Sequence, residues 1–181
     1  MTGKLPWGMF KVIRRDLLEK VNVQFEGYSV GEEAIFSFEI LRNAQNVKFA
    51  DKVIYHYVQN SNGQHTKGDK DPWHPMVTAM KNHLQEIGEY EKYKKSLNSL
   101  ALKAISIGMY RCTMNTNVTD AIKFMSNLHK EYSEEFDIKT FDKESLDTAT
   151  RCVLEMLNYK AYLLIYIASR LRKSKQDKLR G

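Results

Sequence analysis

The sequence predicts an α+β protein that is predominantly helical and divides near residue 70. Residues 1–68 contain short runs of alternating apolar residues between helical patterns, which favours a few short strands. Residues 69–181 carry apolar residues at intervals of three and four along most of their length, which predicts a helical bundle with a basic tail. With 181 residues, 43% of them hydrophobic, the chain suits one compact domain or a small domain with an appendage.

The first part is expected to begin with an amphipathic helix over residues 7–20. A short strand over residues 21–28 follows, and Ser29 then opens a second helix, because Ser29-x-x-Glu32 has the spacing of a capping box. Residues 47–58 alternate like two short extended pieces, and the polar stretch after them predicts a loop. Within that loop we interpret Asp69–Asp71, which reads "DKD", as solvated.

Four apolar stripes with helical spacing follow Pro72. The first three run from Met76 to Ile87, from Leu97 to Cys112 and from Val118 to Leu128, the last with Asn117 or Thr119 as N-cap. Residues 142–173 are expected to form the longest helix, with one shared face made of Leu157, Ala161, Leu164, Ile165, Ala168 and Leu171.

The two cysteines, Cys112 and Cys152, are far apart in sequence and form no CxxC pair. We therefore expect both to be free thiols in the core. The sequence offers no Gly-rich phosphate loop, no HExxH and no nucleophile elbow. His74, His83 and His129 are expected on polar helix faces.

The net charge of +6 belongs to the C-terminus. From Lys160 onward there are seven basic residues and one acidic residue, so the preceding 159 residues hold 28 − 7 = 21 basic and 22 − 1 = 21 acidic side chains. This distribution argues against a basic groove, and no nucleic-acid partner is expected. The tail has two interpretations, a helix on an anionic membrane surface or a core helix with a frayed basic end.

One stretch carries a resemblance to a known family: "FKVIRRDLLEKVNVQFEGYSVGEEAIFSFEILRNAQNVKFADKVIYHYVQN". It resembles the second half of the catalytic domain of family 2 glycosyltransferases over residues 7–67. The shared features are an arginine-pair helix, an acidic pair that opens a helix, a Tyr-x-Tyr strand and a following loop. The resemblance implies that residues 1–68 are the C-terminal, acceptor-side part of a GT-A-like α/β domain and that residues 69–181 are a helical extension.

The same resemblance implies a function. A nucleotide-binding half with an Asp-x-Asp metal site is expected before Met1, so a divalent cation (Mg or Mn) is expected only with that half and no metal site is expected in this chain. The full enzyme would transfer a sugar from a nucleotide-sugar donor to a glycan or lipid-linked acceptor in polysaccharide biosynthesis, with inversion. The isolated chain is expected to be inactive, and a cytoplasmic place at the inner face of the plasma membrane is implied.

Glu33 is the predicted catalytic base. Inverting transfer needs a group that takes the proton of the acceptor hydroxyl, and the first turn of a helix favours an ionised carboxylate. Glu33 aligns with an Asp of the family pattern and is one methylene longer. The alternative interpretation is that Glu32 and Glu33 simply stabilise a helix N-terminus.

The resemblance also implies substrate-binding residues. A loop in this place contacts the donor diphosphate in the family, which here suggests Ser61, His65, Thr66 and Lys67. Glu32 and Trp7 complete the predicted binding set, Trp7 as part of a wall that stacks on the acceptor sugar or, alternatively, as a core residue. A second function also stays open, namely a non-catalytic helical module that binds a protein or a membrane surface.

Overall fold

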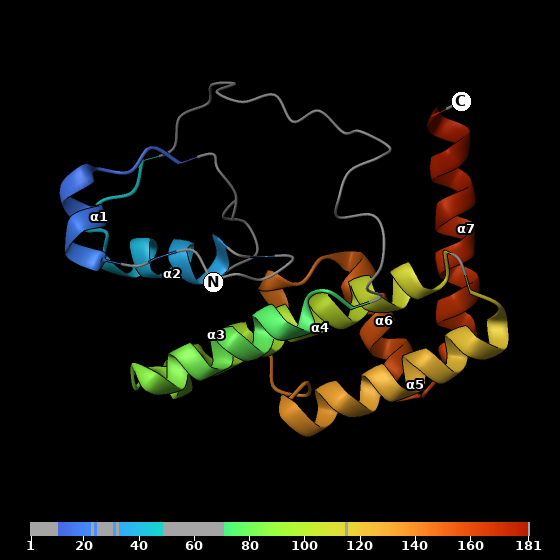
Figure 1. Cartoon of the computed structure of the whole chain (residues 1–181). Helices are drawn as coiled ribbons and strands as arrows, with labels where there is room; N and C mark the ends of the chain where they lie inside the picture. The colour runs from blue at the N-terminus through green and yellow to red at the C-terminus, as the bar shows by residue number, and fades with distance from the viewer. Residues whose placement is uncertain are drawn as a thin grey trace.

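The computed structural model describes residues 11–22, 24, 31, 33–48, 71–114 and 116–180, apart from the side chains of residues 176–180. Within these residues the chain forms seven α-helices, one 3-10 helix and no strand. In chain order they are α1 (Arg15–Val21), α2 (Glu33–Asn43), α3 (His74–Glu86), α4 (Tyr90–Cys112), α5 (Val118–Glu135), η2 (Lys143–Ser145), α6 (Thr148–Asn158) and α7 (Tyr162–Arg180), as Figure 1 shows. The expected fold class, an α+β protein with the C-terminal part of a GT-A-like domain, is therefore wrong for the described part of the chain.

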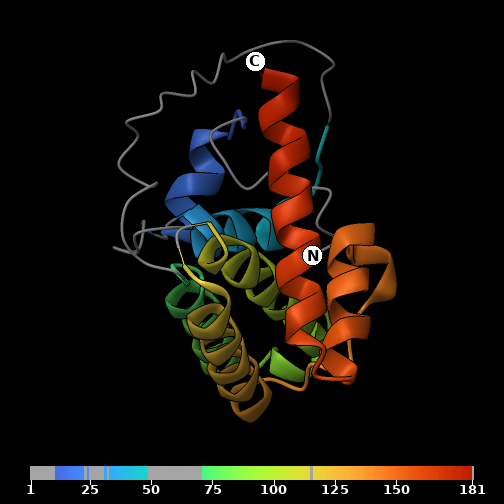
Figure 2. The ribbon, with the colours of Figure 1, turned by 90° about the vertical axis from the view of Figure 1, so that its right-hand side faces the viewer.

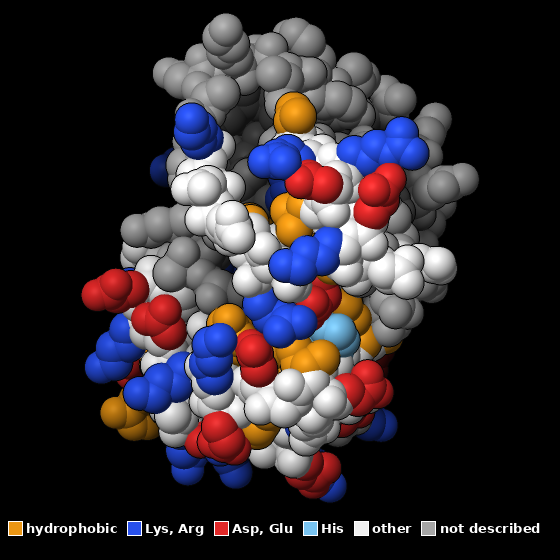
Figure 3. Space-filling model, turned by 90° about the vertical axis from the view of Figure 1, so that its left-hand side faces the viewer, with side chains coloured by type: hydrophobic (Ala, Val, Ile, Leu, Met, Phe, Trp, Pro, Cys, Tyr) orange, Lys and Arg blue, Asp and Glu red, His pale blue; other side chains and the backbone are white. Residues whose placement is uncertain are grey.

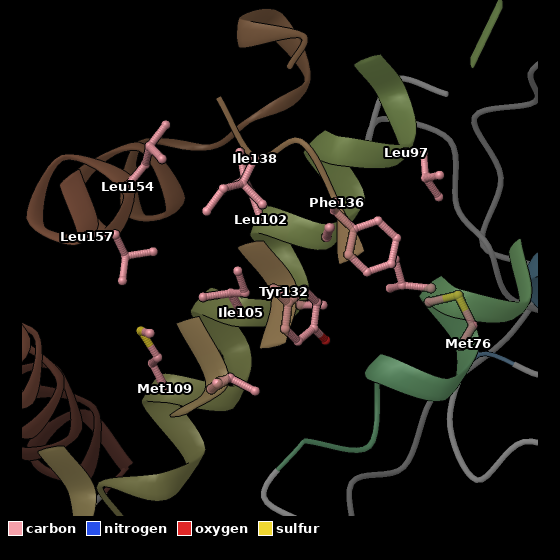
Figure 4. Packing of buried hydrophobic residues seen from close by; sticks show 14 of the residues in the cluster. Met76, Leu97, Leu102, Ile105, Met109, Tyr132, Phe136, Ile138, Leu154 and Leu157 are labelled. Carbon is pink, nitrogen blue, oxygen red and sulfur yellow. The ribbon is translucent and has the colours of Figure 1, made fainter. Parts of the chain in front are cut away.

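Helix α4 is the centre of the fold. It contacts α3, α5, α6, α7 and η2, so its apolar residues are buried on several sides. Figure 4 shows Met109 of α4 beside Leu157 of α6, and Ile105 beside Tyr132 of α5. Close packing of this kind stabilises a fold both by removing apolar surface from water and by dispersion contacts.

Two polar residues of α4 are also buried, and both bind the backbone of the segment after α5. Asn98 Nδ2 donates to the carbonyl oxygen of Thr140 at 2.7 Å. Ser99 Oγ accepts from the backbone N–H of Asp142 at 2.9 Å. Because buried polar groups need partners, these side chains fasten the connection between α5 and α6 to the core helix.

The three apolar stripes are confirmed as buried faces of α3, α4 and α5, except at the start of the third, where Val118 is exposed. A short turn joins α3 to α4, and Gly88 in it has a φ of 69°, which favours glycine. At the other end Asn117 is the N-cap of α5, as predicted, because its side chain accepts from the N–H of Asp120 at 2.9 Å.

The long helix expected over residues 142–173 is wrong, because the chain breaks it twice. Helix α6 ends at Asn158, Lys160 turns the chain with a φ of 51°, and α7 starts at Tyr162. The turn rotates the face that α7 presents to the core. Consequently Ile165 is buried while Leu164 and Leu171, predicted on the same face, are exposed.

The first two helices differ from the expected α/β arrangement. Instead of covering a sheet, α2 packs against α3 with Ala34, Ile35 and Phe38 buried. This helix begins at Glu33, later than the predicted Ser29. Helix α1 begins at Arg15 rather than at residue 7, and none of its residues is buried. The strands predicted over residues 21–28 and 47–58 fall mainly outside the described residues.

Cys112 is buried and free, as predicted. Cys152 is free but exposed on α6, so its predicted place in the core is wrong. The reason is that α6 buries Leu154 and Leu157, and Cys152 lies on another side of this helix.

Replacement of Met109 tests the central role of α4. Because this side chain is fully buried, Met109→Ala should lower the free energy of unfolding by about 2–5 kcal/mol, from lost burial and the cavity left behind. Ile107→Ala, two residues earlier on the exposed side of the same helix, is the control and should cost less than about 1 kcal/mol. Urea denaturation followed by circular dichroism measures both, and equal losses would contradict the packing described here.

Candidate functional site

The predicted base, Glu33, is the first residue of α2 and is half-buried. Ser37, one turn further on, lies on the same side of the helix and accepts a hydrogen bond from Lys11 Nζ at 3.1 Å. Burial lowers the pKa of Lys11, while the negative charge of Glu33 acts against this shift. The structure therefore brings Glu33, Lys11 and Ser37 to one place at the start of α2.

This cluster places a carboxylate beside a lysine at the N-terminal end of a helix, where negative charge is favoured. An ionised carboxylate of this kind can accept a proton from a hydroxyl that reaches it. It can equally be a helix-start glutamate balanced by Lys11, so both interpretations of Glu33 stay open.

The other predicted site residues lie outside the described residues. They are Trp7, Glu32, Ser61, His65, Thr66 and Lys67. In the part that is described, no group of three or more His, Cys, Asp or Glu side chains could hold a metal ion. The predicted site is thus represented by Glu33 and its neighbours.

Sequence reasoning missed a buried acidic residue further along α2. Glu39 Oε2 lies 2.7 Å from Arg42 Nη2, and Glu39 Oε1 lies 2.8 Å from His83 Nε2 on α3. Arg42 Nη1 also reaches Glu89 Oε1, next to the start of α4, at 3.3 Å. The carboxylate of Glu39 therefore links α2 to α3 and, through Arg42, to the beginning of α4.

The same contact includes aromatic packing. The ring of Phe38 lies edge-on to the ring of Tyr93, with centroids 5.1 Å apart, and also edge-on to His83. Such aromatic pairs stabilise beyond their apolar burial. Glu33 lies six residues before Glu39 on α2, so this apolar and ionic contact fixes where Glu33 lies.

The electrostatics of Glu39 are a balance of opposing effects. Burial raises the pKa of Glu39, but the hydrogen bonds from Arg42 and His83 and their positive charges outweigh it, and the pKa lies below its usual range. Glu39 is thus an ionised, fully partnered carboxylate. Its role is to hold helices together, because its oxygens are already occupied.

A second polar cluster lies between α3 and α5. The hydroxyl of buried Tyr132 donates to Asp71 Oδ1 at 3.3 Å, and burial, together with the negative charge of Asp71, raises the pKa of Tyr132. Thr78 Oγ1 donates to Glu135 Oε1 at 2.7 Å. Asp71 is therefore a half-buried structural partner, and our interpretation of it as a solvated loop residue is wrong.

Weak signals for these clusters are present in the sequence. Glu39 stands between Phe38 and Ile40 and three residues before Arg42, a spacing that allows an ion pair on a helix. The three histidines do lie on helices, as predicted, but each is half-buried and contacts another residue: His74 approaches Glu135, His83 approaches Glu39, and His129 contacts Tyr162. These partners come from distant parts of the chain.

The face that carries α1 and α2 has a mixed surface. Figure 3 shows acidic and basic side chains interspersed over its described part, with apolar side chains in small patches. Exposed ion pairs contribute to this pattern, since Arg14 pairs with Asp16 at 2.6 Å and Arg15 with Glu19 at 2.9 Å. Both arginines are thus exposed and paired with an acidic residue nearby in the sequence.

Comparison with known proteins adds no family. No protein-family model, no curated protein and no solved structure matches the chain.

The link through Glu39 predicts a pH dependence of stability. The pKa of Glu39 is lower in the folded chain than in the unfolded chain. The ionised carboxylate therefore adds to the free energy of unfolding above about pH 4.5, and this contribution is lost as the pH falls through the folded pKa. At neutral pH, Glu39→Gln should lower the free energy of unfolding by about 1.5–3 kcal/mol. In acid, the free energies of unfolding of Glu39→Gln and of the unmodified chain should become more alike.

Urea denaturation at a series of pH values measures this effect. Glu19→Gln is the matched control, because Glu19 is in an exposed pair with Arg15 and should change stability by less than about 1 kcal/mol at every pH. A Glu39→Gln difference that is constant from pH 7 to pH 3 would show that the carboxylate charge does not stabilise the contact.

Proposed function

We propose that this chain is the acceptor-side part of a glycosyltransferase that moves a sugar from a nucleotide-sugar donor to a glycan or lipid-linked acceptor. The proposal is supported by the order and spacing of the motifs between residues 7 and 67, which resemble family 2 of these enzymes. The single structural observation that carries it is the half-buried carboxylate of Glu33 at the start of α2.

In this proposal Glu33 takes the proton of the acceptor hydroxyl. The hydroxyl oxygen then forms a bond to the anomeric carbon, while the bond from that carbon to the nucleoside diphosphate breaks and the diphosphate leaves with the electron pair. Lys11, which is close enough to interact with the charge of Glu33, would lie beside the reacting hydroxyl. The divalent cation would be bound by the nucleotide-binding half that the resemblance implies.

In this proposal the helical region also has a role in the reaction. The contact through Glu39 and Phe38 would hold the helix that carries the base against the helical region, so that the base keeps its place when the acceptor binds. The chain would work in the cytoplasm, at the inner face of the plasma membrane, where it could reach a lipid-linked acceptor.

A second candidate is a non-catalytic helical module. It is favoured by where the buried apolar residues lie along the chain. Among the described residues, all but three members of the buried apolar cluster lie from Met76 onward. Residues 71–180 therefore hold most of what the described fold needs. This module would bind through an exposed surface, and it requires no turnover.

Replacement of Glu33 tests the first candidate. The chain would be joined to the segment encoded immediately upstream, and release of nucleoside diphosphate from a panel of nucleotide sugars would be measured. Glu33→Gln keeps the shape of the side chain but cannot accept the proton, so the rate should fall by about 10²–10⁴-fold. Glu33→Asp restores the residue of the family pattern and should retain activity.

The control for this experiment is Glu19→Gln on the exposed side of α1, which should leave the rate unchanged. Full activity of Glu33→Gln would reject Glu33 as the base. Absence of turnover with every donor, from a folded protein, would favour the non-catalytic candidate.

A further inference from the structure

The described residues carry an unusual apolar surface on the outer side of α7. Four large apolar side chains lie there, with exposed fractions of 50% for Leu163, 56% for Leu164, 45% for Ile167 and 67% for Leu171. Their spacing of one, three and four residues places them on one side of the helix. The stripe is about 12 Å long, from the helical rise over eight residues.

The core does not need these four side chains. The inner side of α7 is buried through Ile165 and Ser169, which are 1% and 9% exposed, and it contacts α4, α5 and α6. Tyr162 and Tyr166 pack beside them against the core. The inner side of α7 therefore already makes the contact with the core, and the outer side is apolar as well. Figure 2 shows that α7 extends past the other helices toward its C-terminus.

Two arginines fix which side of α7 faces outward. Arg170 Nη1 donates to the carbonyl oxygen of Thr113 at 3.1 Å, and the guanidinium of Arg172 lies 5.2 Å from the ring centroid of Tyr110. Both partners belong to the C-terminal end of α4, where a positive charge is favourable. Rotation of α7 that would bury the apolar stripe would break these contacts.

The charge next to the stripe indicates the occupant. Residues 160–176 contain no acidic side chain, and Lys175 follows Leu171 at an interval of four residues, which continues the same side of the helix. An apolar stripe that runs into basic residues is complementary to a bilayer with anionic headgroups, where apolar side chains enter the interface and basic ones stay at the headgroups. A second copy of α7 would bring six basic residues and one acidic residue, Asp177, so it would meet these basic residues mainly with further positive charge.

We propose that α7 docks along the surface of an anionic lipid bilayer, with Leu163, Leu164, Ile167 and Leu171 inserted at the headgroup boundary. No helix among the described residues has the length and apolar content needed to cross a bilayer. The helix therefore lies along the surface. This contact does not depend on sugar transfer and extends the proposed function with a binding surface of its own.

Co-sedimentation of the full chain with lipid vesicles tests the proposal. The chain should bind phosphatidylglycerol vesicles and not phosphatidylcholine vesicles, and binding should weaken as salt is raised. The double variant Leu164→Ser, Ile167→Ser should bind at least about tenfold more weakly. Its control is Ile107→Ser, Val118→Ser, which removes two side chains of similar exposure from α4 and α5 and should bind normally.

A charge variant tests the same surface independently. Lys175→Gln should weaken binding by about fivefold. Lys123→Gln, which lowers the net charge equally at an exposed place away from α7, should change it much less. Thermal unfolding of every variant confirms that the helices remain folded.

Three results would overturn the proposal. One is equal binding to both kinds of vesicle, and another is equal binding by the α7 variants and their controls. The third is self-association of the full chain, measured by sedimentation velocity, that the Leu164 and Ile167 substitutions abolish while vesicle binding is absent. Since the assay contains neither donor nor acceptor, its failure would leave the sugar-transfer proposal intact.

Discussion

The burial of α4 on several sides is the constraint on which the rest of the structure depends. An α-helix that contacts α3, α5, α6, α7 and η2 must carry small or apolar residues around most of its circumference. Gly108 shows how tight this requirement is, because a Cβ atom there would lie 3.0 Å from Leu128 Cδ2. Each neighbouring helix then buries one face on α4, and its other face is left to contact other helices or solvent.

The α2 helix is attached to this bundle by a contact of a different kind. Glu39, Arg42 and His83 join α2 to α3 through charge, while Phe38 fills the space beside Tyr93. A buried carboxylate is costly unless its partners are in place, so this contact tolerates little sliding of α2 along α3. The position of Glu33 follows from it, whether that carboxylate accepts a proton or only balances Lys11.

Features that depend on a local sequence pattern were predicted correctly. Features that depend on contacts with residues far away in the chain were not. The stripes of α3, α4 and α5 and the cap at Asn117 are local signals, and all are present in the structure. The end of α6 could not be predicted in this way, because Lys160 takes a positive φ without the glycine that usually marks such a turn. Of the predicted site residues only Glu33 lies within the described part of the chain. The contacts of Glu39 and Asp71 were missed because their partners His83 and Tyr132 lie 44 and 61 residues away.

The turn at Lys160 connects the fold with the surface of α7. In one unbroken helix, Leu164, Ile165 and Leu171 would share a side with Leu157 and would compete for the same core. The break lets α6 bury Leu157 and α7 bury Ile165, and it directs Leu164 and Leu171 outward. Arg170 and Arg172 then hold that orientation against the end of α4. The exposed stripe is therefore a consequence of how the core is completed, and the basic residues that follow it are the reason why we propose a lipid surface as its partner.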